Sequence, residues 1–257
     1  MRKFCVIIPT YNESLNIPPL LDTLTGIMEK TGFQGDIAIA DGQSPDGTAR
    51  IVQEYMQKHS NIFLIDRGGK TELGAAYKLA FNKLLPQDYD VFIQMDADLS
   101  HHPEELPHIL KQLVNDHADL VIGSRYTPSG AIEGWPLKRK LVSRGANFLA
   151  RHVLNLPNRD VTSGYRGWRT DFLKKIDLEK ISADGYVFML EMLCAARRLE
   201  GKIQETPITF TERRQGESKL DLRNIIEYFF LVWRLKLKFI REDAVLHMRQ
   251  LLHRSRR

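Results

Sequence analysis

The sequence predicts an α/β protein with a mostly parallel central sheet and helices on both faces. Two observations lead to this prediction. Short apolar runs alternate along the chain with longer segments whose apolar residues have helical spacing. Within each run, apolar residues follow one another without alternating polar residues, which is typical of strands covered on both faces. A chain of 257 residues with 43% hydrophobic and 27% charged residues also excludes a mainly disordered protein or a fibre.

In the first half, each apolar run is followed by a segment with helical spacing. Strands are expected at Phe4–Pro9, Ile37–Asp41, Ile62–Asp66, Tyr89–Met95 and Ala118–Ile122. Helices are expected at 14–30, 48–57, 71–85 and 103–115. Pro103 suits the first position of the last helix, because proline lacks only an amide that would have no helical partner there.

The second half is more mixed. Helices are expected at 137–154 and 184–199, and a short strand or turn at 164–170. The segment 203–211 resembles a strand interrupted by Pro207. The chain is therefore expected to divide into a catalytic domain, residues 1–220, and a C-terminal segment, residues 221–257.

The C-terminal segment contains an apolar stretch and a basic tail. Leu222–Ile240 is apolar nearly all round a helical wheel, so a helix there must be covered on several sides. It packs either on the protein's own core or against lipid or a membrane partner. The alternating run 233–238 also permits a strand. Residues 234–257 carry eight Lys or Arg and two acids, which fits either a solvated tail or contact with an anionic surface.

Compartment and membrane topology are constrained by what the sequence lacks. The N-terminus shows no secretory signal, and no run approaches the ~20 apolar residues that cross a bilayer. The two cysteines, Cys5 and Cys194, fall in apolar patterns and are expected to be buried and reduced. We therefore expect a peripheral protein on the cytoplasmic face of a membrane.

Polar residues follow four of the predicted strands. Ligands of such sheets bind beyond the carboxyl ends of the strands. Three of these segments present acids and the fourth presents an arginine: Thr10–Glu13, Asp41–Gln43, Asp96–Asp98 and Gly123–Tyr126. The functional site is expected at this edge of the sheet.

Asp96 and Asp98 are one residue apart at the exit of a strand. Two carboxylates placed there can face one hard cation, Mg²⁺ or Mn²⁺, which keeps positions for water and substrate phosphates. The alternative is that the pair only supplies negative charge at the start of the following helix.

Basic residues complement the acids. Arg125, Arg139, Arg213 and Lys219 lie near predicted loops or helix starts. Each alone fits a surface cation, but acids for a metal combined with arginines for phosphate suggest diphosphate chemistry. The loop at 68–71 lacks the spacing of a P-loop, and no dinucleotide fingerprint follows the first strand. The adjacent His101 and His102 are not expected to bind zinc.

Six ordered motifs carry a family resemblance. They are Pro9–Glu13, Ser44–Thr48, Asp96–His101, Gly123–Tyr126, Ser163–Arg166 and Gly216–Lys219. The chain resembles the family 2 glycosyltransferases of GT-A fold, and within them the dolichyl-phosphate (polyprenol-phosphate) mannose synthases. The match runs from about Phe4 to Lys219.

The resemblance implies a mannosyl transfer from GDP-mannose to a polyprenyl monophosphate with a divalent metal. It implies a nucleotide-sugar site at Pro9, Tyr11, Glu13, Ala40, Asp41, Gly42, Asp96, Ala97, Asp98, Arg213 and Lys219. Metal binding is implied for Asp96, Asp98 and Ser100, and a catalytic role for Asp98, Arg213 and Lys219. Acceptor-phosphate binding is implied for Arg125, Arg139 and Ser143, and the lipid entrance is expected at Trp135–Pro136.

A phosphate monoester acceptor is already largely ionised at neutral pH, because its second pKa is about 6, so it needs no general base. In-line attack would invert the anomeric centre. Two alternatives stay open: a UDP-glucose-dependent enzyme, and one that glycosylates a hydroxyl with a base such as Glu191. A non-enzymatic sugar-nucleotide sensor is a third reading. We expect membrane contact or an integral-membrane partner, and no nucleic acid.

Overall fold

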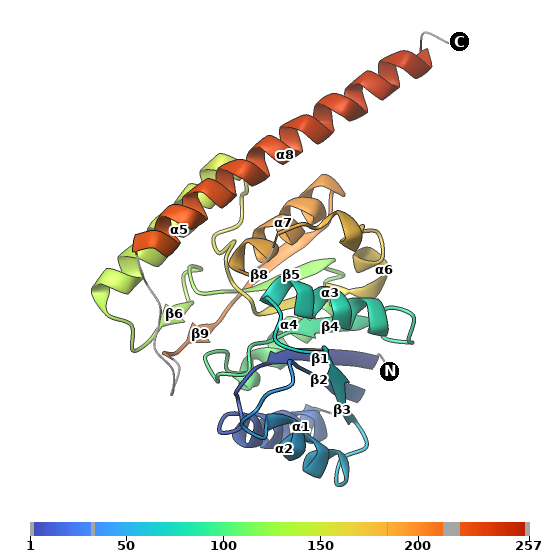
Figure 1. The fold of residues 1–257 in the computed structure, drawn as a ribbon, viewed down its shortest axis with the longest axis vertical. Helices are drawn as coiled ribbons and strands as arrows, with labels where there is room; N and C mark the ends of the chain where they lie inside the picture. Colours follow the sequence, from blue (N-terminus) through green and yellow to red (C-terminus); the bar gives the residue numbers. More distant parts are fainter. Residues whose placement is uncertain (1–2, 32–33, 184, 213–221, 255–257) are drawn as a thin grey trace.

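The computed structural model describes residues 3–31, 34–183, 185–212 and 222–254. Within these residues the central sheet has seven strands in the order β3-β2-β1-β4-β7-β5-β8 (Figure 1). They are β1 (Lys3–Thr10), β2 (Gln34–Asp41), β3 (Ile62–Asp66), β4 (Val91–Gln94), β5 (Leu120–Ser124), β7 (Arg166–Arg169) and β8 (Ile203–Pro207). All neighbours pair in parallel except β7, which is antiparallel to both β4 and β5. The predicted mostly parallel sheet is confirmed.

Helices cover both faces of the sheet, as predicted. Alternate residues of β1 enter different cores: Val6 and Ile8 pack with α1 (Ile17–Thr31), α2 (Thr48–Met56) and α4 (Leu106–Val114). Cys5 and Ile7 pack with α3 (Leu73–Leu84) and α7 (Gly185–Arg198) on the opposite face. Because both faces are covered, the strands are apolar throughout. Cys5 and Cys194 are buried free thiols, as expected.

Strand β7 in the middle of the sheet carries two large buried side chains. Trp168 Nε1 donates to Gln94 Oε1 on β4 (2.6 Å). The Arg166 guanidinium donates to the carbonyl oxygens of Ser163, Val161 and Met189. These bonds satisfy a buried cation without a carboxylate and fix the loop before β7 to α7.

Short elements complete the carboxyl edge of the sheet. Pro207 ends β8, as its missing amide suggests, and the chain continues into β9 (Thr209–Phe210). Strand β9 pairs in parallel with β6 (Ala131–Ile132), which the sequence analysis did not predict. A short helical turn, η1 (Pro103–Glu105), precedes α4, and α6 (Thr170–Leu173) and η2 (Leu178–Lys180) connect β7 to α7.

Two long helices lie side by side along one flank of the molecule, α5 (Leu137–Leu154) and α8 (Leu222–Arg254) (Figure 1). The strand alternative for 233–238 is wrong, and the expected basic tail continues the helix to Arg254. Helix α8 packs on α5 and α7, and its distal part extends past the body. The division of the chain at residue 220 stays a prediction.

Among the described residues, the protein's own core covers only part of α8, and covering of the rest by lipid or a membrane partner stays a prediction. Val232 and Leu235 are buried, but exposed apolar side chains outnumber them: Ile226, Phe229, Phe230, Leu231, Trp233, Leu237 and Ile240. An ion pair contributes to the packing of α8, because Lys238 reaches back to buried Glu191 on α7. None of the helices in the described part of the chain combines the length and apolar character that crossing a bilayer requires.

Candidate active site

The loops after β1 and β2 form one wall of the site. Asp41 is 2% exposed, and its carboxylate accepts hydrogen bonds from Thr10 Oγ1 (2.8 Å), Ser44 Oγ (2.6 Å) and the Ser44 amide (2.8 Å). Pro9 lies beside Ala40 in the parallel register of the two strands. The structure therefore brings these predicted nucleotide-binding residues together at the carboxyl edge of the sheet.

Arg67, which the sequence analysis missed, ties the loop after β3 to this wall. Its Nη2 donates to the Thr10 carbonyl oxygen (2.7 Å) and its Nη1 to Thr71 Oγ1 (2.9 Å). Burial lowers the pKa of Arg67, although the charge of Asp41 opposes this. A Cβ atom at Gly42 would lie 2.5 Å from Arg67 Nη2, so a larger residue there would displace this guanidinium. A single arginine after a strand carries no local signal of such a role.

The loop after β1 presents Tyr11 and Glu13. Lys70 Nζ lies 4.6 Å from the centroid of the Tyr11 ring. The Glu13 amide donates to Thr48 Oγ1 (3.0 Å), and its carboxylate accepts from Asn16 Nδ2 (2.7 Å). These bonds fasten the loop to the start of α2 and place a cation over the aromatic ring.

Asp96 and Asp98 follow β4, as predicted, beside the buried ring of His101. The Asp96 side chain is 34% exposed and Asp98 is 8% exposed. Asp98 Oδ1 accepts a hydrogen bond from the Ser100 amide (3.1 Å). The Asp96 amide donates to His101 Nδ1 (3.2 Å), so this nitrogen carries a lone pair. Burial lowers the pKa of His101 in spite of the two nearby aspartates, so the ring is neutral at pH 7.

The chemistry of this corner fits a divalent cation. Ser100 Oγ is buried and has no hydrogen-bond partner in the part of the chain that the structure describes. A buried hydroxyl beside two carboxylates supplies the oxygen ligands that a hard cation takes. Ala97, between the two aspartates, is buried. The described residues contain no group of three or more His, Cys, Asp or Glu side chains that could hold a metal ion.

Aromatic rings connect the aspartates to the predicted lipid entrance. The ring centroids of His101 and Phe210 lie 5.3 Å apart, and those of Phe210 and Trp135 5.4 Å apart. Phe210 belongs to β9, so the short second sheet positions this wall. The unpredicted pairing of β6 with β9 therefore has a function in shaping the site.

The guanidinium of Arg125, for which acceptor-phosphate binding stays a prediction, is paired with a buried acid. Its Nε and Nη2 donate to the two carboxylate oxygens of Asp160 (2.7 and 2.8 Å), and Nη2 also donates to Thr162 Oγ1 (2.8 Å). Asp160 is fully buried. Burial alone would lower the pKa of Arg125. The charge and hydrogen bonds of Asp160 outweigh burial and raise this pKa above its ordinary value. A guanidinium held in the interior needs such a partner, and 35 residues of sequence separate the two.

The structure gathers the three predicted acceptor residues around two aromatic rings. The Arg139 guanidinium lies 3.9 Å from the centroid of the Trp135 ring, and Arg125 lies 6.0 Å from the same centroid. Ser143 Oγ is 2.8 Å from the hydroxyl of Tyr126, whose ring centroid is 5.4 Å from Arg125. Two loops and one helix thus place these residues in one neighbourhood.

Arg213 and Lys219, the predicted phosphate-closing residues, lie outside the described residues. Glu212, immediately before them, forms an ion pair with Arg139, and its amide donates to the Glu133 carbonyl oxygen (3.2 Å). The described chain therefore reaches the acceptor residue Arg139 at Glu212. The role of Arg213 and Lys219 stays a prediction.

Glu191, the candidate base for a hydroxyl acceptor, is fully engaged in the structure. It is 1% exposed, and its carboxylate accepts hydrogen bonds from the amides of Ser182 (2.9 Å) and Ala183 (2.6 Å). It also forms an ion pair with Lys238. This carboxylate holds α8 and the loop before α7 in place, which gives it a structural role.

Comparisons with known proteins agree with this geometry. Residues 5–177 match the family described as glycosyl transferase family 2. The chain is 40% identical over 232 residues to a polyprenol monophosphomannose synthase from Mycolicibacterium smegmatis, which covers 90% of this chain and 86% of that protein. It is 41% identical over 218 residues to an undecaprenyl-phosphate mannosyltransferase from Micrococcus luteus, which covers 85% and 87%.

Solved structures show the same fold. A glucosyl-3-phosphoglycerate synthase from Mycobacterium tuberculosis, crystallised with Mn²⁺, uridine diphosphate and glucosyl-3-phosphoglycerate, aligns with a TM-score of 0.66 at 17% identity, over 92% of this chain and 79% of that one. A mannosyl-3-phosphoglycerate synthase from Rubrobacter xylanophilus aligns with a TM-score of 0.67 at 16% identity, over 95% and 75%. At these identities the likeness concerns the fold alone.

Proposed function

The chain belongs to glycosyl transferase family 2, and on this premise we propose that it is a polyprenyl-phosphate mannosyltransferase. The fold is GT-A and the protein is a glycosyltransferase. The observation that carries the proposal is the Asp96–Asp98 pair at the end of β4, with the unpartnered Ser100 hydroxyl beside it. The names of the two relatives support mannose as the sugar and a polyprenyl phosphate as the acceptor.

We infer that the donor is GDP-mannose and that the metal is Mg²⁺ or Mn²⁺. The loops that carry Asp41, Tyr11 and Glu13 would hold the nucleoside, and Asp96 and Asp98 would hold the metal. The metal, when bound, would neutralise charge on the leaving diphosphate. Lys70 over the Tyr11 ring would add a positive charge at the donor side of the site.

The acceptor phosphate needs no enzyme base, since its oxygen is already ionised. An oxygen of this phosphate would attack the anomeric carbon as the bond from that carbon to the diphosphate oxygen breaks, which inverts the centre. Arg139 on the Trp135 ring and Ser143 would hold the acceptor. The full engagement of Glu191 disfavours the hydroxyl-acceptor alternative.

We propose that α5 and α8 bring the acceptor to the site by resting on a membrane. Exposed apolar residues occur on both helices, for example Leu141 (58%) on α5 and Phe230 (66%) on α8. Basic residues on the same helices suit anionic headgroups. An integral-membrane partner is the alternative occupant of this surface. Two reduced buried thiols support the cytoplasmic face as the location.

The test is a matrix of donors and metals with one acceptor. Purified protein is incubated with a polyprenyl phosphate, with GDP-mannose or UDP-glucose, and with Mg²⁺, Mn²⁺ or a chelator. We expect β-linked polyprenyl-phosphate mannose from GDP-mannose only, and no product with chelator. Product from UDP-glucose alone would show that UDP-glucose is the donor in place of GDP-mannose. Undiminished synthesis without divalent ions would refute the metal role. A rate that requires a deprotonated enzyme carboxylate would favour the hydroxyl acceptor.

A further inference from the structure

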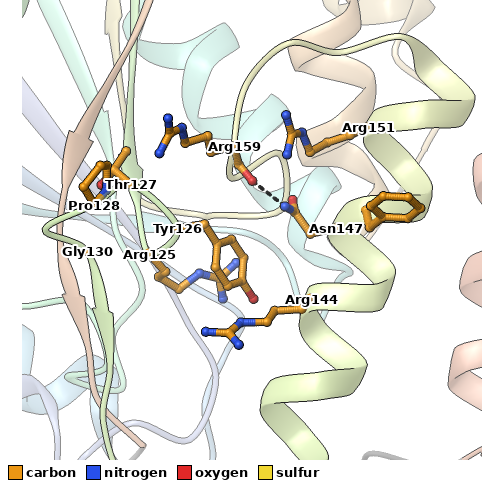
Figure 2. Close-up of a pocket in the computed structure, with 10 residues that line it drawn as sticks. Arg125, Tyr126, Thr127, Pro128, Gly130, Arg144, Asn147, Arg151 and Arg159 are labelled. Atoms are coloured by element: carbon orange, nitrogen blue, oxygen red, sulfur yellow. Dashed lines mark hydrogen bonds between the residues drawn. The ribbon is translucent and has the colours of Figure 1, made fainter.

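An arginine-lined pocket opens between the loop after β5, helix α5 and the loop before β7 (Figure 2). Its volume is about 630 Å³. Four arginines line it: Arg125, Arg144, Arg151 and Arg159. In Figure 2 the guanidinium groups of Arg151 and Arg159 lie toward one end of the pocket and those of Arg125 and Arg144 toward the other. We call this the arginine pocket.

Only one of the four arginines of the arginine pocket, Arg125, pairs with an acid in the described part of the chain. No carboxylate is among its lining residues. Asp160, behind Arg125, already engages that arginine from both carboxylate oxygens. Among the described residues, no ion pair involves Arg144, Arg151 or Arg159. Three arginines without an acidic partner therefore face one cavity, and an anion bound between them would be attracted by all three.

The frame of the pocket is held rigidly although three of its four arginines have no acidic partner among the described residues. Asn147 Nδ2 donates to the Arg159 carbonyl oxygen, and Asn147 Oδ1 accepts from the Val161 amide (2.9 Å). The carboxylate of Glu205 accepts hydrogen bonds from the amides of Arg159 (2.8 Å) and Asp160 (2.9 Å). The loop before β7 is therefore fastened to α5 and β8 from two sides. A preformed frame reduces the ordering that a ligand would otherwise require.

Arg151 gives the strongest sign of a missing partner. Its Nε is buried and has no hydrogen-bond partner within the described ranges, while its Nη2 makes only a long bond to the Pro157 carbonyl oxygen (3.3 Å). A buried donor without an acceptor costs free energy. A phosphate oxygen would satisfy it, because the planar guanidinium matches phosphate geometry with two parallel bonds.

The arginine pocket adjoins the predicted acceptor site: Arg125 belongs to both, and Tyr126, which lines the pocket, is hydrogen-bonded to Ser143. Arg139 and Ser143 do not line it. Phe148, which does line it, is 61% exposed on α5, so the pocket opens beside apolar surface. A phosphate attached to a lipid would find cations and apolar contact together at this position.

We propose that the arginine pocket binds a phosphate group other than that of the polyprenyl acceptor. The phosphate is carried either by an anionic phospholipid headgroup or by a free phosphate ion. The inference stands on the unpaired arginines and does not require the proposed transferase activity.

The experiment compares two double variants of the full chain that remove equal charge from the same helix. Arg144→Gln with Arg151→Gln alters the pocket, and Lys138→Gln with Lys140→Gln alters only the start of α5. Each protein is titrated with inorganic phosphate by calorimetry and sedimented with vesicles of phosphatidylglycerol in phosphatidylcholine. Because each lost charge-assisted hydrogen bond weakens binding substantially, we expect the pocket variant to lose about tenfold or more in affinity. The lysine variant should lose less than about twofold in the phosphate titration. On vesicles, where any cation of α5 contributes to binding, it should lose less than the pocket variant.

The vesicle and phosphate measurements distinguish the two sources of the phosphate group. A tenfold loss on phosphatidylglycerol vesicles, with phosphate as competitor, supports the headgroup, and a loss in the phosphate titration alone supports the free ion. Equal losses in both variants, or none in either, would overturn the proposal. The proposal would also be overturned if the only defect of the pocket variant were a raised KM for polyprenyl phosphate in detergent, because the pocket would then serve the acceptor. Melting temperatures check that each variant folds. If the wild type bound phosphate in the pocket but showed no transfer activity, the proposed function would be refuted and this inference would stand.

Discussion

In the loops after β1 and β2, polar side chains are bonded to one another, whereas the arginines beside α5 face a cavity. Asp41 accepts three hydrogen bonds from Thr10 and Ser44, and Asp46 accepts from the Ser14 amide and from Thr48. Beside α5, in contrast, Arg125 pairs with an acid, but the other three pocket arginines have no acidic partner in the described chain.

This difference predicts how the two proposed sites would meet their ligands. A site whose walls are bonded to one another is preorganised, so little free energy is lost in ordering it when the donor binds. A site whose cations lack counter-ions has its electrostatic partner supplied by the ligand. Substitutions in the loops after β1 and β2 should therefore change donor binding by altering geometry. Substitutions among the arginines beside α5 should change ligand binding by altering charge.

The largest effect is expected where the two halves meet, at Asp98. Asp98→Asn keeps an oxygen for the Ser100 amide but removes the charge, so the fold should persist while metal binding fails. We expect the rate of transfer to fall about a thousandfold, equivalent to about 4 kcal/mol. Initial rates with Mn²⁺ and melting temperatures measure this. Exposed Glu104→Gln is the control, and a normal rate in Asp98→Asn would refute the metal site.

The next effect tests whether charge dominates the α5 half. Asp160→Asn leaves Arg125 buried without a counter-ion, so the free energy of unfolding should fall by about 3 kcal/mol. Asp177→Asn, which removes an exposed pair with Lys180, should change it by less than about 1 kcal/mol. Denaturant unfolding of both variants measures the difference. Equal, small losses would show that the buried pair is dispensable.

The same pair gives a pH dependence. Burial alone would raise the pKa of Asp160, but Arg125 and the surrounding hydrogen bonds outweigh it and hold the pKa below its ordinary value. The stabilisation is therefore complete above the unfolded pKa of about 4 and is lost as pH falls through the folded value. Unfolding curves of the wild type should show this acid loss, and those of Asp160→Asn should show less of it.

The fold was largely predictable from the sequence because its signals are local. Apolar runs placed β1 to β5 within a few residues, and Pro207 marked the break between β8 and β9. Strand β6 has two residues, too few to give a pattern. The exposure of α8 was not predictable, because an apolar helix has the same sequence whether protein covers it or not.

The candidate site was predictable only where it depends on position in the sheet. Asp96 and Asp98 follow a buried strand, so the rule for strand ends located them. The pairing of Arg125 with Asp160 depends on two loops meeting across β7, and the contact of Arg67 with Thr10 spans 57 residues. Neither contact leaves a pattern in one sequence, so both arginines could be described only as cations near strand ends.

A smaller effect tests how firmly α8 is attached to the catalytic domain. Lys238→Met leaves the buried carboxylate of Glu191 with its two amide bonds only, so the free energy of unfolding should fall by about 2 kcal/mol. Arg234→Met, at an exposed position of the same helix, is the control. Protease cleavage after residue 212 and denaturant unfolding measure attachment and stability. An unchanged stability in Lys238→Met would show that apolar packing alone holds α8.

The smallest effect tests the preorganised donor wall. Asp41→Asn replaces a carboxylate that accepts from two hydroxyls and one amide with a group that accepts at one oxygen only. The affinity for the nucleotide sugar should fall about fivefold, close to 1 kcal/mol, with little change in the rate at saturation. Asp66→Asn, at the end of the neighbouring strand but exposed, should bind the donor normally. Because the loss acts through the position of the loop, it should be the same with Mg²⁺ and with Mn²⁺. A defect that depends on which metal is present would instead connect Asp41 to the cation and remove the distinction between geometry and charge.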